Sequence, residues 1–64
     1  MTLRQRRYEK GMTQMELAIA ANVEQSSISH YEQGHWKPNP KTAKKLADVL
    51  GCTVGELMKG FDEA

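Results

Sequence analysis

Few side chains in this sequence are suited to nucleophilic or metal chemistry, and their spacing supports neither. Ser27 and Ser29 have no base at a position from which a helix would bring it beside them. His30, His35 and Cys52 offer three metal ligands at best, in a spacing that matches no known ligand pattern. There is no glycine-rich phosphate loop. We therefore expect no enzyme activity, no metal site and no cofactor.

The charged residues favour a different chemistry, which is binding to phosphate. The formal net charge is only +1, but the basic residues fall into two blocks, within residues 1–10 and 35–45, and residues 11–34 contain no Lys or Arg. Localised basic patches on a small polar chain are compatible with nucleic-acid binding. The alternative is that these charges only solvate helix faces.

The composition is that of a small globular domain. The chain has 64 residues, of which 39% are hydrophobic and 27% charged, and this predicts a single domain over residues 1–64. No apolar run approaches the roughly 20 residues of a membrane span, and no signal peptide is evident. A single free thiol, Cys52, fits a reducing cytoplasm.

Helix start and stop signals divide the chain. Thr2, Thr13 and Thr53 are each followed three residues later by Gln or Glu, the pattern of a capping box, and Asn39 precedes Pro40. Glycines end the apolar-periodic runs at positions 11, 34, 51 and 60. No stretch alternates with period two, so no strand is expected. The signals predict five helices, at about 2–10, 13–20, 24–33, 40–50 and 53–59.

Apolar spacing then predicts one small core. Its members come from all five predicted helices and the turns between them: Leu3, Met12, Leu17, Ala18, Ala21, Val23, Ile28, Tyr31, Leu46, Val49, Leu50, Val54 and Leu57.

Residues 13–33 have the pattern of a helix-turn-helix. Leu17 and Ala21 share one helical face, and Ala18 is small where a second helix must cross closely. Asn22 lies where the chain needs a left-handed residue, a conformation that Asn tolerates. Ile28 and Tyr31, three apart, form the inward face of the second helix. A short helix, a sharp turn and a second helix make up this motif.

The sequence resembles the phage-repressor (Xre/Cro/cI-type) helix-turn-helix family over nearly its whole length. The matching residues in and near the motif are Thr13-Gln14, Leu17-Ala18, Val23, Ser27-Ile28-Ser29, Tyr31-Glu32 and Gly34, followed by Pro38, Leu46-Ala47, Leu50-Gly51 and Glu56-Leu57. The resemblance implies an all-α, compact, five-helix lambda-repressor-like domain.

The resemblance also implies where bases would be read. In this family the second helix of the motif enters the major groove and its N-terminal half meets base edges. The residues opposite Ile28 and Tyr31 are Gln25, Ser26, Ser29 and His30. Glutamine can pair with adenine N6 and N7, whereas serine discriminates weakly. A merely solvated helix face is the alternative.

Other residues are assigned by the same resemblance. Phosphate contacts are expected from Thr13 and Gln14 at the start of the motif's first helix, and from Gln33, Lys37 and Lys41. Arg7 and Glu32 are expected to form a partly buried, structural ion pair.

The roles of Glu24 and Trp36 stay open, and the motif departs from the family pattern in two further ways. Glu24 stands where many family members place a Ser or Thr cap, and its carboxylate would repel phosphates unless it accepts from cytosine N4. The helix over 24–33 contains no Arg or Lys for a bidentate contact with guanine. Asn22 replaces the usual glycine. Trp36 either covers the core or lies along the DNA backbone.

Met58 and Phe61 are expected on an outer face of the last helix, where family members often dimerise. The alternative is that they fold back on the core.

These observations predict a sequence-specific DNA-binding transcriptional regulator, in particular a repressor of bacterial or phage type, that binds double-stranded DNA as a homodimer. The alternative is a protein-interaction module of the same fold, an antitoxin or an anti-repressor partner, which binds DNA weakly and a regulatory protein strongly. Exposed Ile19, Met58 and Phe61 favour that second interpretation.

Overall fold

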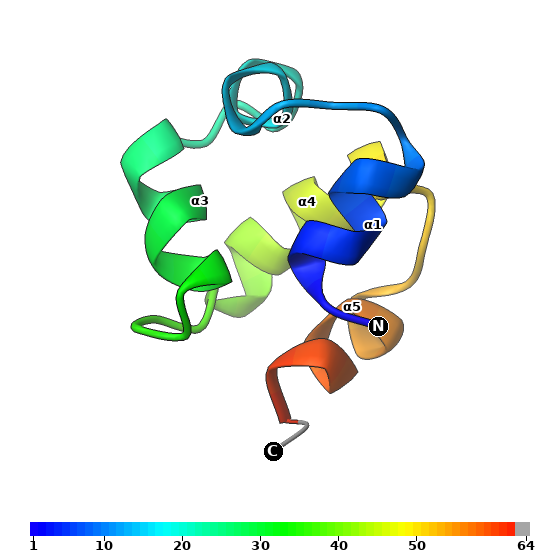
Figure 1. The fold of residues 1–64 in the computed structure, drawn as a ribbon. Coiled ribbons are helices and arrows are strands. Elements are labelled where there is room, and N and C mark those ends of the chain that lie inside the picture. The colour runs from blue at the N-terminus through cyan, green and yellow to red at the C-terminus, as the bar shows by residue number, and fades with distance from the viewer. Residues whose placement is uncertain (63–64) are drawn as a thin grey trace.

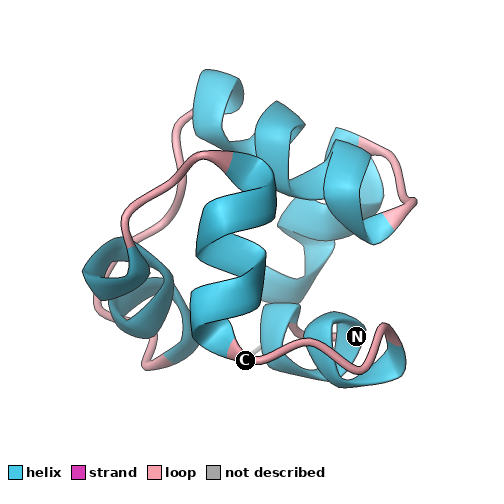
Figure 2. Cartoon of the chain, turned by 90° about the horizontal axis from the view of Figure 1, so that it is seen from above, coloured by secondary structure: helices cyan, strands magenta, loops and turns pink. Residues whose placement is uncertain are grey.

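The computed structural model describes residues 1–62, which form five helices joined by short loops (Figure 1). The helices are α1 (Leu3–Glu9), α2 (Gln14–Ala21), α3 (Gln25–Glu32), α4 (Pro40–Leu50) and α5 (Val54–Asp62). Figure 2 shows only helix and loop in this part of the chain. The predicted all-α class is therefore confirmed.

Three helices begin at reciprocal capping boxes, as the sequence predicts. The Thr13 hydroxyl accepts from the Glu16 N–H at 3.1 Å, while the Glu16 carboxylate accepts from the Thr13 N–H at 2.9 Å. Thr2 and Gln5 are paired in the same way at α1, and Thr53 and Glu56 at α5. Since each box satisfies backbone N–H groups that the helix itself leaves unpaired, it fixes where the helix begins.

Each of the first four helices is followed within two residues by a left-handed residue, namely Gly11, Asn22, Gly34 or Gly51. Asn22 has φ 55° and ψ 50°, as expected for a turn residue that is not glycine. After each left-handed residue the next N–H donates to the carbonyl five residues earlier, which is the Schellman arrangement. The four pairs are Met12 to Arg7, Val23 to Ala18, His35 to His30 and Cys52 to Ala47.

The prediction that Gly60 ends the last helix is wrong. Helix α5 continues through Gly60 to Asp62, and Gly60 is not among the glycines with positive φ. Its role is spatial, because a Cβ at Gly60 would collide with the Met1 carbonyl oxygen and would lie 3.2 Å from the Thr2 Cα. The end of α5 and the start of α1 lie side by side (Figure 1) because position 60 has no side chain.

Most of the predicted core is buried. Leu17, Ile28, Leu46 and Leu57 are completely enclosed. Several residues expected in the core are only partly buried and pack against its edge, namely Met12, Val23, Tyr31, Val49 and Val54. Two buried alanines of α4, Ala43 and Ala47, were not in the predicted core. Small residues there let α4 approach its neighbours closely.

Within residues 1–62, helix packing leaves one side of α3 without a neighbouring helix. Helix α2 packs against α3 and α4, α4 also packs against α5, and α1 contacts both α3 and α5. Figure 1 shows α3 at the edge of the molecule, joined by a short loop to α2. Among residues 1–62, no helix combines the length and apolar character needed to cross a membrane.

Candidate nucleic-acid interface

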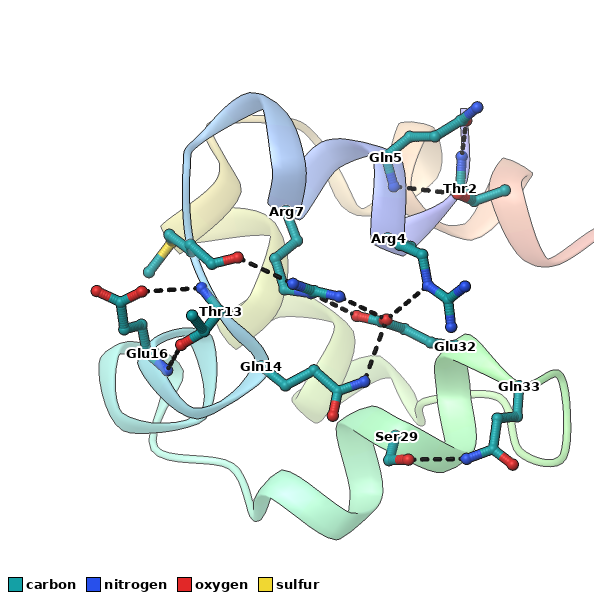
Figure 3. Close-up of polar contacts among 11 residues, drawn as sticks. Thr2, Arg4, Gln5, Arg7, Thr13, Gln14, Glu16, Ser29, Glu32 and Gln33 are labelled. Carbon is teal, nitrogen blue, oxygen red and sulfur yellow. Dashed lines mark hydrogen bonds and ion pairs between the residues drawn. The ribbon is translucent and has the colours of Figure 1, made fainter.

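A buried carboxylate, Glu32 at the end of α3, holds together the elements that form the interface. The Arg7 guanidinium donates to Glu32 Oε2 at 2.7 Å and to Oε1 at 2.9 Å. Arg4 Nε donates to the same Oε1 at 3.1 Å, and Gln14 Nε2 at 3.2 Å. Figure 3 shows these three side chains converging on Glu32 from α1 and α2. We call Glu32, Arg4, Arg7 and Gln14 the Glu32 cluster.

The electrostatics of this cluster favour the charged forms. Burial raises the pKa of Glu32, but hydrogen bonds from Arg7, Arg4 and Gln14 outweigh burial and hold that pKa below its ordinary value. The hydrogen bond to Glu32 likewise raises the pKa of Arg7 above its usual range, against the effect of desolvation. The Glu32 side chain is 0% exposed and that of Arg7 only 8%, so the pair predicted from the sequence is present and buried.

Gln14, expected at a phosphate, is also part of this cluster. It is the first residue of α2, and its side chain extends toward Glu32 (Figure 3). The bond to Glu32 occupies one N–H of its amide group. Its other side-chain N–H and its backbone N–H, which is one of the unpaired groups at the helix start, are the donors suited to an anion.

Thr13, the other residue expected there, has a more constrained role. Its backbone N–H donates to the Glu16 carboxylate, and its hydroxyl oxygen accepts from the Glu16 N–H. Hydrogen bonding of the Glu16 carboxylate to Thr13, mainly through the Thr13 backbone N–H and then through its side chain, lowers the pKa of Glu16. Because the Thr13 N–H is bonded to Glu16, only the Thr13 hydroxyl proton is available to donate to a phosphate. The negative charge of the Glu16 carboxylate would disfavour a phosphate at the same helix start.

The residues expected to read bases lie on the exposed side of α3. Gln25 and Ser26, in the first turn, are exposed, while Ser29 and His30, one turn further, are partly buried. Ile28, between them in the sequence, is 0% exposed and faces the core. Glu24 is the N-cap residue of α3 but makes no side-chain capping bond.

Gln33 is tied to this face rather than extended from it. Its Nε2 donates to the Ser29 hydroxyl oxygen at 2.8 Å, on the side of α3 away from Glu32 (Figure 3). This bond uses one lone pair of the Ser29 hydroxyl, which keeps its own proton to donate. Gln33 keeps its carbonyl oxygen and a second N–H, so a phosphate contact from Gln33 is compatible with the bond but remains a prediction.

An aromatic group follows α3. The Trp36 ring stacks on His30 with centroids 4.1 Å apart and meets the edge of Tyr31 at 6.4 Å. His30 Nδ1 lies 3.3 Å from His35 Nδ1. Trp36 is nevertheless 50% exposed, so it covers the end of α3 without being enclosed.

The lysines expected at phosphates are both exposed. Lys41 lies in the first turn of α4. Lys37 Nζ contacts Asp62 Oδ1 at 3.3 Å, in a pair whose side chains are 62% and 70% exposed. Such a pair contributes little to stability and opens at little cost. Lys37 can therefore leave Asp62 for a phosphate.

Met58 and Phe61 do not form the expected outer face. Both are partly buried and pack against the core, and the Phe61 ring meets the edge of Tyr31 at 6.4 Å. The alternative, in which they fold back on the core, describes the structure. A dimer contact through them would use only the parts of their surfaces that remain accessible.

Sequence reasoning missed several contacts of this interface. Arg4 joins Arg7 at Glu32, and nothing in the helical spacing of α1 distinguishes the two arginines as partners of a residue 25 or more positions away. The His30–His35 contact had a signal, because Gly34 places residues 30 and 35 at the paired positions of a Schellman cap.

Comparison with known proteins agrees with this arrangement. A helix-turn-helix family model matches residues 3–57. The chain is 42% identical over 48 residues to a protein of Yarrowia lipolytica named as a multi-protein-binding factor, covering 75% of this chain and 32% of that protein. It is 33% identical over 60 residues to the HTH-type transcriptional regulator DdrOP3 of Deinococcus deserti, covering 94% of this chain and 46% of that one.

A shorter relative is covered more fully. An HTH-type transcriptional regulator of Archaeoglobus fulgidus is 34% identical over 61 residues, which are 95% of this chain and 87% of that protein. The chain spans less than half the length of the Yarrowia and Deinococcus relatives. No solved structure matches significantly. With a family model that covers both the five-helix core and the α2–α3 motif, the chain belongs to the helix-turn-helix family of the phage-repressor (Xre/Cro/cI) type.

Proposed function

We propose that this chain is a sequence-specific DNA-binding transcriptional regulator that reads the major groove with α3. The observation that carries the proposal is the division of α3 into two faces. Ile28 and Glu32 fix the helix to the rest of the domain, while the polar side chains of Gln25 and Ser26 are exposed. Relatives in Deinococcus and Archaeoglobus are named as transcriptional regulators, which supports the same function.

In this proposal the contacts divide into two kinds. Gln25, Ser26, Ser29 and His30 meet base edges, and Gln25 in the first turn of α3 is suited to the bidentate contact with adenine. Gln14, at the start of α2, and the lysines at 37 and 41 meet phosphates on either side. The Glu32 cluster joins the two kinds of contact, because Gln14 and α3 are both bonded to it.

The proposal includes a dimer on a palindromic site. The α3 helices of the two copies would enter two successive major grooves on one side of the DNA. It also includes repression, by occupation of a promoter. Both are tested by the experiment that follows and by a reporter placed behind the selected site.

The test is selection from a random duplex library with the purified protein, followed by titration of the selected sequence at two salt concentrations. An enriched palindrome with half-sites centred about 10–10.5 base pairs apart supports a dimeric, sequence-specific regulator. Affinity for it should fall steeply with salt, since phosphate contacts release counterions. Absence of enrichment, with only weak salt-sensitive binding, overturns the proposal.

A second candidate is a protein-interaction module of the same fold. The observation that favours it is on α2, where Ile19 is 73% and Met15 52% exposed, four residues apart. Residues at this spacing share one face of a helix. An apolar contact through them would change little with salt. Substituting both with Gln separates the candidates, because it should leave DNA affinity unchanged and weaken only a protein complex.

A further inference from the structure

Two histidines meet at the end of α3. His30 Nδ1 and His35 Nδ1 are 3.3 Å apart, and the rings are tilted by 42° with centroids at 5.5 Å. His30 belongs to the second half of α3, and His35 to the loop that follows it. Neither side chain is part of the hydrophobic core.

The backbone brings these two residues together. Gly34 is left-handed, with φ 81°, and the His35 N–H donates to the His30 carbonyl at 3.0 Å. In such a cap the side chains of the two bonded residues come into contact, ordinarily as an apolar pair. At the other three caps the second residue, Met12, Val23 or Cys52, does pack against the core.

The cap of α3 departs from that pattern. Its second residue, His35, is exposed and brings a ring nitrogen to the first residue instead of an apolar group. The pair therefore offers two nitrogen ligands on a backbone that is already ordered. The five-residue separation of the two histidines matches no common zinc motif, so the sequence alone did not indicate a metal site there.

The distance between the nitrogens fits a tetrahedral metal site as well as it fits a hydrogen bond. Zinc binds imidazole nitrogen at about 2.0–2.1 Å, so two nitrogens at a tetrahedral angle lie about 3.3–3.4 Å apart. The two Nδ1 atoms are at 3.3 Å. No group of three or more His, Cys, Asp or Glu side chains able to hold a metal occurs within residues 1–62, so water must complete the coordination.

From this geometry we propose that His30 and His35 chelate a divalent transition ion such as zinc through their Nδ1 atoms. The ion replaces the hydrogen bond between the two rings and joins α3 to the loop that carries Trp36 and Lys37. Both rings then carry their proton on Nε2. Two protein ligands make an exchangeable site that responds to free metal, not a permanent structural one.

The test is a titration of the full chain with Zn²⁺ alone, in which binding is measured by calorimetry and by the fluorescence of Trp36. Trp36 is the one tryptophan of the chain and stacks on His30 at 4.1 Å, so its emission should change saturably at one equivalent. His30→Gln and His35→Gln should each weaken binding at least tenfold. Cys52→Ser is the matched control, which removes the free thiol and should leave binding unchanged.

Thermal unfolding gives an independent readout. At free Zn²⁺ ten times the dissociation constant, binding to the folded state should raise the midpoint by about 6–11 °C in a domain of this size. Neither histidine variant should show this rise. No saturable binding to the wild-type chain, or equal binding by the histidine variants, overturns the proposal and leaves the contact as a hydrogen bond.

A third variant tests whether the cap positions the ligands. Gly34→Ala retains both histidines, and a Cβ there would meet nothing within 4 Å, but it disfavours the left-handed conformation. It should weaken Zn²⁺ binding while circular dichroism still shows a folded protein. Affinity equal to wild type would show that the cap does not preorganise the pair.

The consequence for DNA rests on the proposed function. With Nδ1 bound to metal, His30 can only donate, through Nε2–H, and so would meet base acceptors such as guanine N7 or O6. Selection with and without Zn²⁺ should then differ at the position read by His30. Zn²⁺ binding without DNA is measured separately, so failure of DNA recognition would not be mistaken for failure of the metal site.

Discussion

Arg7 on α1 and Glu32 on α3 are joined by two hydrogen bonds, at 2.7 and 2.9 Å, in a pair from which solvent is almost excluded. Arg7 also donates to the Met12 carbonyl at 2.9 Å, in the turn before α2. One guanidinium thus holds both α3 and the turn that leads to α2. The pair determines the orientation of the proposed DNA-binding surface rather than taking part in it.

The first prediction concerns the loss of one partner of this pair. Glu32→Ala should lower the free energy of unfolding by about 3–5 kcal/mol, because it leaves the Arg7 charge buried without its partner. Chemical denaturation measures the change. The double variant Arg7→Met/Glu32→Leu should lose clearly less free energy of unfolding than the sum of the losses of Arg7→Met and Glu32→Leu made singly. Additive losses would show that the two residues do not interact.

The second prediction concerns acid. The pKa of Glu32 is lowered in the folded state, so its contribution to stability is complete above the ordinary glutamate value of 4.5 and is lost as pH falls through the lower folded value. Glu16 and Glu56, whose capping bonds from Thr13 and Thr53 lower their pKa values, act in the same direction. Urea denaturation between pH 7 and pH 2 should show stability falling at the acid end.

Glu32→Gln is the control for the acid prediction. It removes the titrating group that is bonded to Arg7, so the fall in stability with acid should become shallower, with the remainder due to the capping glutamates. An unchanged dependence on pH would contradict the assignment to Glu32.

The third prediction compares two glycines of α5. Gly60→Ala should destabilise the domain by about 1–3 kcal/mol, as overpacking does, since its Cβ would collide with backbone atoms of Met1 and Thr2. Gly55→Ala should stabilise it by up to about 1 kcal/mol, because the new Cβ would meet the Thr53 Oγ1 atom only at an ordinary contact distance of 3.9 Å. Thermal unfolding of both variants should give shifts of opposite sign.

The fourth prediction separates base reading from phosphate binding. Gln25→Ala should cost about 1–3 kcal/mol on the selected site and relax preference at one base pair. Lys41→Ala should weaken binding to all sequences and reduce the salt slope by about one. Binding curves for selected and scrambled duplexes at several salt concentrations measure both. The docking described for α3 would be wrong if neither variant changed DNA binding.

The fifth prediction concerns Asp62. Asp62→Asn removes the carboxylate that pairs with Lys37 at 3.3 Å and a negative charge near the proposed phosphate contact. DNA affinity should therefore rise at low salt, and the gain should shrink as salt screens the charge. Lys37→Ala should act in the opposite direction, and combined with Asp62→Asn it should remove most of the gain. If Asp62→Asn raised DNA affinity equally with and without Lys37, the gain would not come from releasing Lys37.

Local signals in the sequence predicted most of the fold. Capping boxes at Thr2, Thr13 and Thr53, and left-handed residues at Asn22 and Gly34, act within a few positions of the helix ends they define. Such signals depend on nearby backbone groups alone. The five helices and the α2–α3 motif follow from them.

The errors and omissions concern contacts between distant parts of the chain. The sequence around Gly60 resembles a helix end, but the backbone that lies against Gly60 is that of Met1, 59 residues away. No local pattern encodes this contact. The bond from Gln14 to Glu32 similarly depends on how α2 and α3 pack. Candidate DNA contacts were predictable as residue types on a face, whereas the bonds that occupy Gln14 and Gln33 required the structure.

The two faces of α3 have a consequence for how such a protein can diverge. Ile28 and Glu32 carry the helix's attachment to the domain, and neither Gln25 nor Ser26 shares in it. Substitutions at positions 25 and 26 are therefore nearly neutral for folding. After gene duplication, two copies of this chain can acquire different operators through a few surface changes while keeping the same scaffold, and need no compensating mutation in the core.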